Sequence, residues 1–378
     1  MFTLTEKERR HEAIRGLIDA LHLKALILIG DTNVGNGFYG DLRYYTNHRV
    51  IFQRQVAAVF PEGGPVLFAG TALGKEAASR RSFIKDCRLT GENQAADIVT
   101  VLRERGVFSG QVGINFLMLP AAWLSYLKQE LPGIEWVETH PEIMRIRFSE
   151  HSAEEAQVFR EGAALGTGAF EAALKVIRPG ISEYEIVAEI EHYACARGAE
   201  ENFTLIASGR FSLGNDNTLT LPYAPSRRRI EAGDSVVMEI TPRYEGYWTQ
   251  IVRTVNVGKP NSDLDKIHRV CCEALKNGLE ALKPGMRVMD VGLAMEAYVK
   301  TTGYLFRPPI GHICGVDLID DRVSLQSSMI LESGMAVIIH PTIFTPDEKR
   351  SIFWGETYLV TKDGYERLHL KGNELITL

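Results

Sequence analysis

The sequence predicts a two-domain α/β protein whose second domain repeats one structural pattern. Three observations support this class. Strands alternate with helices up to about residue 145, as in a small α/β domain. Two segments of about 110 residues then each contain a long helix, a Pro-Gly stop, a second helix closed by glycine, and strands. Residues 231–254 have the pattern of a β-hairpin. We therefore expect domains at 1–147 and 148–378.

The first domain is expected to begin with a surface helix at residues 5–22 and a buried strand at 25–31. The glycine-rich turn at 31–42 lacks a phosphate-binding arrangement, so we expect no nucleotide there. Two strands around the turn at 61–64, a helix near 73–80 and a strand at 112–116 complete this domain. Ser149 or Ser152, followed by acidic residues, is the start signal for the first long helix of the second domain.

The composition excludes several classes of function. The hydrophobic content of 45% and charged content of 24% are those of an ordinary globular protein. A net charge of -6 and a pI near 6.0 argue against nucleic acid as a partner. Apolar runs are too short to span a membrane, and the first residues contain no apolar signal core. Five cysteines without metal-like spacing indicate free thiols, so we expect a cytoplasmic protein.

The hairpin carries the first candidate site residues. Glu239 lies on its outgoing strand and Gln250 on its returning strand, where the two side chains can face each other on one side of the sheet. His312, His340 and Glu356 occur on later strand-like or glycine-flanked segments. We expect these five side chains to converge on one metal ion or substrate.

Further motifs extend along nearly the whole chain. They are RYYTNH at 43–48, the serine-acidic helix start, both Pro-Gly stops, Gly233-Asp234, the segment 309–312, Gly334-Met335 and the segment 356–364. Together they resemble the superfamily of methionine aminopeptidase, prolidase, aminopeptidase P and creatinase. The resemblance implies a pita-bread C-terminal domain with pseudo-twofold symmetry and a smaller creatinase/prolidase-like N-terminal α/β domain.

The resemblance also assigns the metal positions of this superfamily, where the peptidases use Asp, Asp, His, Glu and Glu. In this chain the corresponding residues are Glu239, Gln250, His312, His340 and Glu356. Two divalent cations need bridging carboxylates, and an amide cannot replace one, so the resemblance implies that the dinuclear centre is lost.

A single ion is the expected replacement. His312, His340 and Glu356 match the ligand set of mononuclear non-haem iron, so we expect one divalent metal ion, with Fe(II) favoured and Mn or Zn also compatible. Glu239 or Gln250 would be a fourth ligand or would orient a histidine. The alternative is that His340 is a hydrogen-bonded core residue in a metal-free pocket.

Two groups that serve peptide cleavage in prolidase-like members are absent. Tyr223 takes the place of a histidine before the hairpin, and Ile319 takes the place of a histidine after His312. Tyr223 can donate a hydrogen bond, but a phenol with an ordinary pKa near 10 is a weak acid at neutral pH. Its alternative role is aromatic packing. These losses argue against Xaa-Pro cleavage.

A further resemblance concerns creatinase. Phe52 and Arg54 match a Phe-x-Arg motif that reaches the partner subunit's pocket and holds the substrate carboxylate, which implies a homodimer. The alternative is that Arg54 is a surface residue. Creatinase's catalytic histidine and the glutamate of its returning hairpin strand are absent, with Val252 at the latter position, so creatine hydrolysis is not implied.

Three more residues are candidates for substrate binding. Trp248 and Trp354 each lie two residues before a candidate ligand, so each would wall the pocket or pack in the core. Arg322 follows His312 and would meet a substrate anion or remain solvated.

The sequence therefore predicts a non-peptidase enzyme with a single-metal site that acts on a small carboxylate-bearing, amino-acid-like substrate. The simplest reaction is C–N bond hydrolysis, with Glu239, Glu356 and Tyr223 as catalytic residues. The alternatives are a mononuclear iron oxygenase or lyase, and a metal-free binding scaffold.

Overall fold

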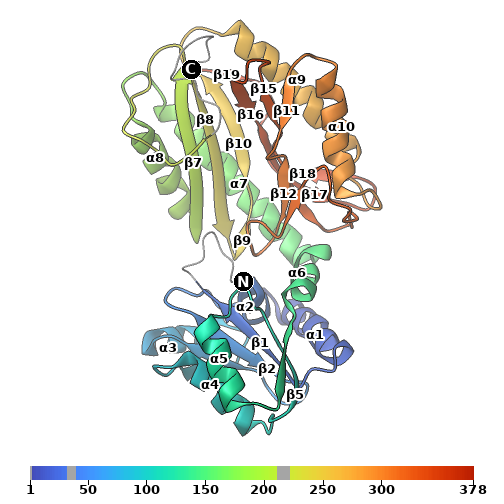
Figure 1. Ribbon diagram of the computed structural model, residues 1–378. Helices are drawn as coiled ribbons and strands as arrows, with labels where there is room; N and C mark the ends of the chain where they lie inside the picture. Colours follow the sequence, from blue (N-terminus) through green and yellow to red (C-terminus); the bar gives the residue numbers. More distant parts are fainter. Residues whose placement is uncertain (1, 32–39, 211–221) are drawn as a thin grey trace. The chain divides into compact units, whose positions relative to one another are not determined.

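The computed structural model describes residues 2–31, 40–210 and 222–378. Most of the predicted glycine-rich turn at 31–42 therefore lies outside the described residues. The contacts divide the chain into two units, Met1–Arg147 with Val316–Leu318, and Phe148–Gly315 with Ile319–Leu378. Each unit contains a sheet and helices, which confirms the predicted mixed α/β class (Figure 1).

The first unit is built on a six-stranded sheet of order β4-β3-β2-β1-β5-β6. Its central strand β1 is fully buried, pairing antiparallel with β2 and parallel with β5. The strands are β1 (Ala25–Gly30), β2 (Gln55–Val59), β3 (Val66–Ala69), β4 (Asp86–Leu89), β5 (Gly110–Ile114) and β6 (Ile134–Glu138). The helices are α1 (Leu4–Ala20), α2 (Gly40–Thr46), α3 (Ala72–Arg81), α4 (Gln94–Glu104), α5 (Ala121–Glu130) and α6 (His140–Ser149).

The second unit contains a large sheet whose main path has the order β13-β12-β14-β17-β10-β8-β7, and a small sheet of order β11-β15-β16. In the large sheet, β18 also pairs with β17, β19 with β10 and β9 with β8. The first strands are β7 (Glu201–Arg210), β8 (Asp234–Tyr244), β9 (Tyr247–Trp248) and β10 (Ile251–Asn256). The later ones are β11 (Leu305–Arg307), β12 (Gly311–Cys314), β13 (Asp321–Val323), β14 (Ala336–Ile339), β15 (Thr342–Phe344), β16 (Ser351–Phe353), β17 (Gly355–Val360), β18 (Tyr365–Arg367) and β19 (Ile376–Thr377).

Two helix pairs repeat in this unit, α7 (Ala153–Val176) with α8 (Glu183–Cys195), and α9 (Ser262–Glu280) with α10 (Val288–Lys300). Ser152 and Glu155 form a capping box at the start of α7, which settles the predicted helix start in favour of Ser152. Gly180 and Gly285 adopt positive φ in the two Pro-Gly stops, a conformation that ends a helix at low cost in glycine. None of the described helices is both long and apolar enough to cross a membrane.

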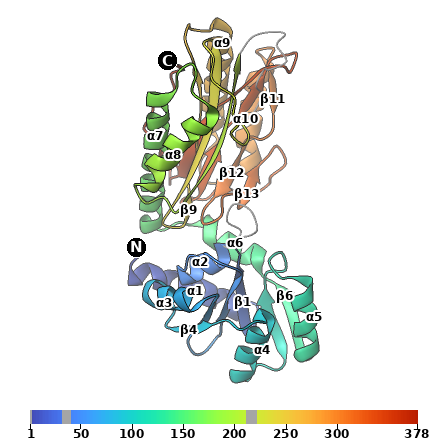
Figure 2. The ribbon, with the colours of Figure 1, turned by 90° about the vertical axis from the view of Figure 1, so that its left-hand side faces the viewer.

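The two faces of the large sheet have different surroundings. On one face Met238, Ile240 and Ile251 pack with residues of α7 and α8 in one hydrophobic core. Figure 2 shows α7 and α8 along one side of these strands. On the other face Val237, Val252 and Phe353 form a separate small cluster. Because side chains alternate along a strand, this division decides which candidate residues can share a site.

Candidate functional site

Four positions on neighbouring strands define one row across the face opposite α7 and α8. Glu239 on β8 pairs with Val252 on β10, and Val252 pairs with Gly355 on β17. His340 directly follows β14, one residue beyond the pair Ile339–Glu356, so it continues the row beside Gly355. Directly paired residues point to the same side of a sheet. We call this face, which carries Glu239, His312 and His340, the site face.

The sequence predicts that Gln250 and Glu239 face each other across the hairpin. In the structure Gln250 lies diagonally from Glu239, because Val252 is the direct partner of Glu239. The tight turn at Glu245-Gly246 pairs Arg243 with Trp248, and the same register pairs Glu239 with Val252. Gln250 is therefore two residues away from the partner of Glu239, still on the site face. Its amide Oε1 and Nε2 are buried and make no hydrogen bond to any residue that the structure describes.

The two histidines of the site face lie next to each other. His312 on β12 is the cross-strand neighbour of Ile338, two residues before His340, and the ring centroids are 5.5 Å apart. His340 is 4% exposed, and its ring packs edge-on against Phe353. Burial lowers the pKa of His340 to about 4, so the imidazole is neutral at pH 7. Its Nδ1 has no hydrogen-bond partner among the described residues.

Glu239 is the carboxyl group of this face. Its side chain is half-buried, and burial raises its pKa to about 7. A carboxyl with that pKa is partly protonated and partly ionised at neutral pH. It can therefore take a proton from water and return a proton to a leaving group, which is the behaviour expected of a general acid–base catalyst.

Glu356 points to the opposite face of the sheet, contrary to its predicted place beside His312 and His340. It pairs directly with Ile251 and Ile339, and Ile251 belongs to the core formed with α7 and α8. The structural reason is the period of two along β17, where Gly355 and Thr357 take the positions on the site face.

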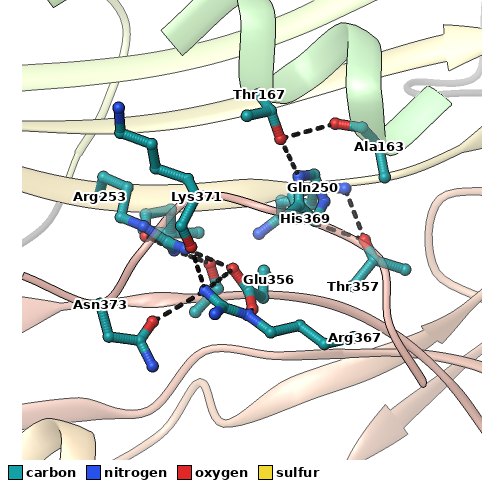
Figure 3. Close-up of polar contacts among 12 residues, drawn as sticks. Ala163, Thr167, Gln250, Arg253, Glu356, Thr357, Arg367, His369, Lys371 and Asn373 are labelled. Carbon is teal, nitrogen blue, oxygen red and sulfur yellow. Dashed lines mark hydrogen bonds and ion pairs between the residues drawn. The ribbon is translucent and has the colours of Figure 1, made fainter. Parts of the chain in front are cut away.

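Glu356 is held there by two arginines (Figure 3). Arg253 and Arg367 both form ion pairs with its carboxylate, and Arg253 is 1% exposed. Arg253 Nη1 also donates to the backbone oxygens of Val252 and Gly355, each at 2.8 Å. Burial acts to raise the pKa of Glu356, but the charge of Arg253 and the hydrogen bond from Arg367 hold it below its ordinary value. This cluster ties the segment after β18 to the sheet.

Gly355 is the residue of β17 that faces the site, and it offers no ligand atom. A Cβ at this position would lie 2.0 Å from the backbone oxygen of Ile339 and 2.4 Å from Cα of His340, so a side chain has no room. The backbones of β14 and β17 approach closely here. The floor of the row between Glu239 and His340 therefore consists of Val252 and Gly355.

The donor set does not fit the five-ligand metal centre that the resemblance implied. The site face carries one amide, two imidazoles and one carboxyl that is half-protonated near pH 7. Among the described residues, no group of three or more His, Cys, Asp or Glu side chains could hold a metal ion. The predicted set of His312, His340 and Glu356 is not assembled, because Glu356 lies on the other face.

The two candidate arginine clamps have different surroundings. Arg322 on β13 is the direct cross-strand partner of His312, and its guanidinium forms no ion pair with the described residues. Arg54 belongs to the first unit and pairs with the buried Asp31 at 2.8 Å. Phe52 is 62% exposed. Arg322 is therefore the cation that the structure places beside the site face.

The remaining candidates are two buried tryptophans and an exposed tyrosine. Trp354 is 1% exposed and packs edge-on against His268 of α9, with the Arg253 guanidinium 4.6 Å from its ring centroid. Trp248 is equally buried, with the Arg243 guanidinium 5.3 Å from its ring. Both tryptophans are core residues. Tyr223 is 78% exposed, with its backbone bridged to Ile206 of β7, and residues 211–221 before it lie outside the described residues.

Sequence reasoning missed two features of this region. The first is the role of Gly355 as the site-facing residue of its strand, which counting in steps of two from Thr357 could have indicated. The second is Thr357, whose Oγ1 accepts from the backbone N–H of Gln250 at 2.8 Å. This contact fixes the start of β10 beside the site, and the sequence contains no signal for it.

Comparison with known proteins identifies the class and then the family. Residues 157–362 match the model of metallopeptidase family M24, and residues 10–149 match the Creatinase/Prolidase N-terminal domain. The chain belongs to metallopeptidase family M24. The pita-bread superfamily, with its creatinase-like N-terminal domain, is thereby confirmed as predicted.

Individual relatives agree with this assignment. An Xaa-Pro dipeptidase of Pyrococcus horikoshii is 30% identical over 68% of this chain and 73% of its own length. An Xaa-Pro dipeptidase of Pyrococcus furiosus is 32% identical over 59% of this chain, and the match spans 64% of that relative's length. The structure of an Xaa-Pro dipeptidase from Bacillus anthracis has a TM-score of 0.83 and 25% identity, covering 98% of this chain and 100% of that one.

These relatives contradict one sequence-based conclusion. The expectation of a non-peptidase function conflicts with relatives that are Xaa-Pro dipeptidases. That expectation rests on the replaced metal ligands and on the two histidines replaced by Tyr223 and Ile319. Replacement of the metal ligands changes the side chains available at the site, but it does not by itself show that the protein catalyses a different reaction.

Proposed function

We propose that this protein hydrolyses the C–N bond of a small peptide-like substrate that carries a carboxylate, with an Xaa-Pro dipeptide as the first substrate to test. The observation that carries the proposal is the placement of Glu239, whose pKa is raised to about 7, in one row with the neutral imidazole of His340. The Xaa-Pro dipeptidases among the relatives support the substrate class.

Glu239 and His340 lie at the two ends of the row. Glu239 and His340 lie three strands apart, which at roughly 4.8 Å per strand places their backbones about 14 Å from each other before sheet curvature. Between them lie the side chain of Val252 and Gly355, which has no side chain. A substrate amide resting on this floor would meet the carboxyl from one side and the imidazole from the other.

Each group then has a chemical task. Ionised Glu239 takes a proton from the attacking water, and the carboxyl so formed gives a proton to the leaving nitrogen. The imidazoles of His340 and His312 hydrogen-bond the carbonyl oxygen where negative charge develops. The buried amide of Gln250, without a described partner, hydrogen-bonds the substrate and so fixes its position. No step passes through a metal ion, because the donor set does not fit one.

Arg322 supplies the group that recognises the carboxylate. It extends from β13 beside His312, where it is exposed and has no ion-pair partner among the described residues. A guanidinium binds a carboxylate through two parallel hydrogen bonds. A free carboxylate next to the scissile bond is the feature that separates a dipeptide from a longer peptide.

The test is an assay with Ala-Pro and with N-acetyl-Ala-Pro-amide, which lacks both charged ends. We expect release of proline from the dipeptide and no cleavage of the blocked compound. Glu239→Gln should lower kcat by about 10²-fold or more, because one oxygen with acid–base capacity is removed. No cleavage of any dipeptide by the wild-type protein would contradict the proposal.

Two further features stay proposals. A homodimer would bring Arg54 of one subunit to the other subunit's site, and sedimentation of the purified chain tests the dimer. The five cysteines are all free thiols in the structure, which supports a reducing compartment such as the cytoplasm. The predicted single metal ion, with iron favoured, requires Glu356 as a ligand together with His312 and His340. Glu356 faces the helices, so only the two histidines of that set lie on the site face.

A further inference from the structure

The first unit contains a cavity that the proposed reaction does not use. It has a volume of about 270 Å³ and lies between α1, α2 and the turn that joins β2 to β3. Small-molecule sites in proteins are concave, mostly apolar, and carry a few polar groups that fix the ligand. This volume suits a ligand of about ten non-hydrogen atoms.

The walls of the cavity combine stacked rings with prolines. His11 and Tyr45 stack with centroids 4.2 Å apart and an interplanar angle of 14°. Phe60, Pro61 and Pro65 contribute apolar surface from the end of β2 and the following turn. Such walls favour a flat apolar group over a hydrated one.

The charge at the cavity comes from Arg15. His11 is neutral, because burial and then the charges of Lys7, Arg15 and Arg10 lower its pKa to about 4, although its hydrogen bond to Tyr45 opposes this. Its Nε2 lies 3.0 Å from the backbone oxygen of Tyr45 and therefore carries the proton. Arg15 is exposed and forms no ion pair or hydrogen bond with the described residues.

The hydroxyl of Tyr45 is the second polar group. Tyr45 lines the cavity and is 4% exposed. Arg15 lines the same cavity as Tyr45. A phenolic hydroxyl at the cavity wall can donate a hydrogen bond to a bound carboxylate. Arg15 and Tyr45 can together hold one carboxylate.

We propose that this cavity is a second ligand site of the protein, and that it binds a small monocarboxylate bearing an apolar ring. The ring lies against His11 and Phe60, and the carboxylate accepts hydrogen bonds from Arg15 and the Tyr45 hydroxyl. The site lies within the first unit and shares no residue with the site face of the second.

Isothermal titration calorimetry of the full chain with phenylacetate tests this site, with phenylacetamide as the uncharged counterpart. We expect one phenylacetate per chain and a loss of affinity of about 10-fold in Arg15→Ala, because a charge-assisted pair is removed. Arg9→Ala is the matched control, since Arg9 lies on the same helix, pairs with Glu6 and does not line the cavity. It should change the affinity by less than about 2-fold.

Three outcomes would overturn the proposal. They are no saturable binding of phenylacetate, equal affinity for phenylacetamide, and equal affinity in Arg15→Ala. Binding that is lost in Arg322→Ala and kept in Arg15→Ala would place the ligand on the site face, and this also refutes the second site. Circular dichroism of each variant confirms that the comparison is made on folded protein.

Discussion

Glu356 lies directly opposite Ile251 in the ladder between β10 and β17, and so it faces the helices and not Glu239. This single register relationship separates a structural carboxylate from a catalytic one. Glu356, which the sequence predicts to be a metal ligand, instead forms buried ion pairs with Arg253 and Arg367.

Glu356→Gln should therefore act on stability. The substitution leaves the buried Arg253 without its carboxylate, and breaking a buried pair costs about 3–5 kcal/mol. The free energy of unfolding in urea measures this. Glu366→Gln is the matched control, because its pair with Arg160 is exposed on both sides and is worth less than about 1 kcal/mol. Equal losses in the two variants would contradict the assignment.

Arg322→Ala should raise KM for Ala-Pro by about 10-fold or more and change kcat little. The guanidinium binds the substrate carboxylate in the ground state and the transition state alike, so its loss weakens uniform binding. Steady-state kinetics measure both constants. Arg54→Ala serves as the comparison, since a larger increase of KM in that variant would favour the clamp from a partner subunit.

Chelation should leave the activity unchanged. In the described part of the chain, no three His, Cys, Asp or Glu side chains are grouped so that they could hold a metal ion, and Gly355 supplies no bridging carboxylate. The measurement is the metal content per chain, with dipeptidase activity before and after dialysis against EDTA. One stoichiometric ion together with a loss of activity that Mn²⁺ or Zn²⁺ restores would refute this view of the donor set.

Acid should destabilise the folded protein progressively below about pH 6.5. Burial lowers the pKa values of four histidines to about 4, so the unfolded chain binds more protons than the folded one between pH 6.5 and 4. They are His11, His268, His340 and His369. Their contribution is complete above pH 6.5 and is lost as the pH falls toward 4. Glu239 opposes this, because its raised pKa destabilises the fold as the pH rises from 4.5 to 7.

The four histidines outweigh the single carboxyl of Glu239, so the net free energy of unfolding should fall as the pH is lowered from 6.5 to 4.5. Urea midpoints across this range measure the slope. Glu239→Gln should steepen the fall, since it removes the opposing group and adds about 1–3 kcal/mol at pH 7 relative to the wild type. A slope that the substitution does not change would show that Glu239 has an ordinary pKa.

The sequence predicted much of the fold, because its signals are local. The capping residue Ser152, the Pro-Gly stops and the hairpin turn each leave a pattern within a few residues. The site was harder, since it depends on which face of a strand a residue takes. Gly355 and Glu356 are neighbours on one strand, so their side chains point to opposite faces of the sheet. An error of one position therefore assigns Glu356 to the site face, whereas it lies in the buried ion-pair cluster. Cross-strand contacts such as Thr357 to Gln250 leave no local signal.

The pH dependence of kcat/KM for Ala-Pro hydrolysis, in the wild type and in Glu239→Gln, tests the central claim most directly. The account predicts a wild-type rate that rises with pH through an apparent pKa near 7, where Glu239 becomes ionised. In Glu239→Gln the rate should fall by about 10²-fold or more, and the rise near pH 7 should be absent. A variant that keeps both the rate and the rise near pH 7 would show that another group is the base.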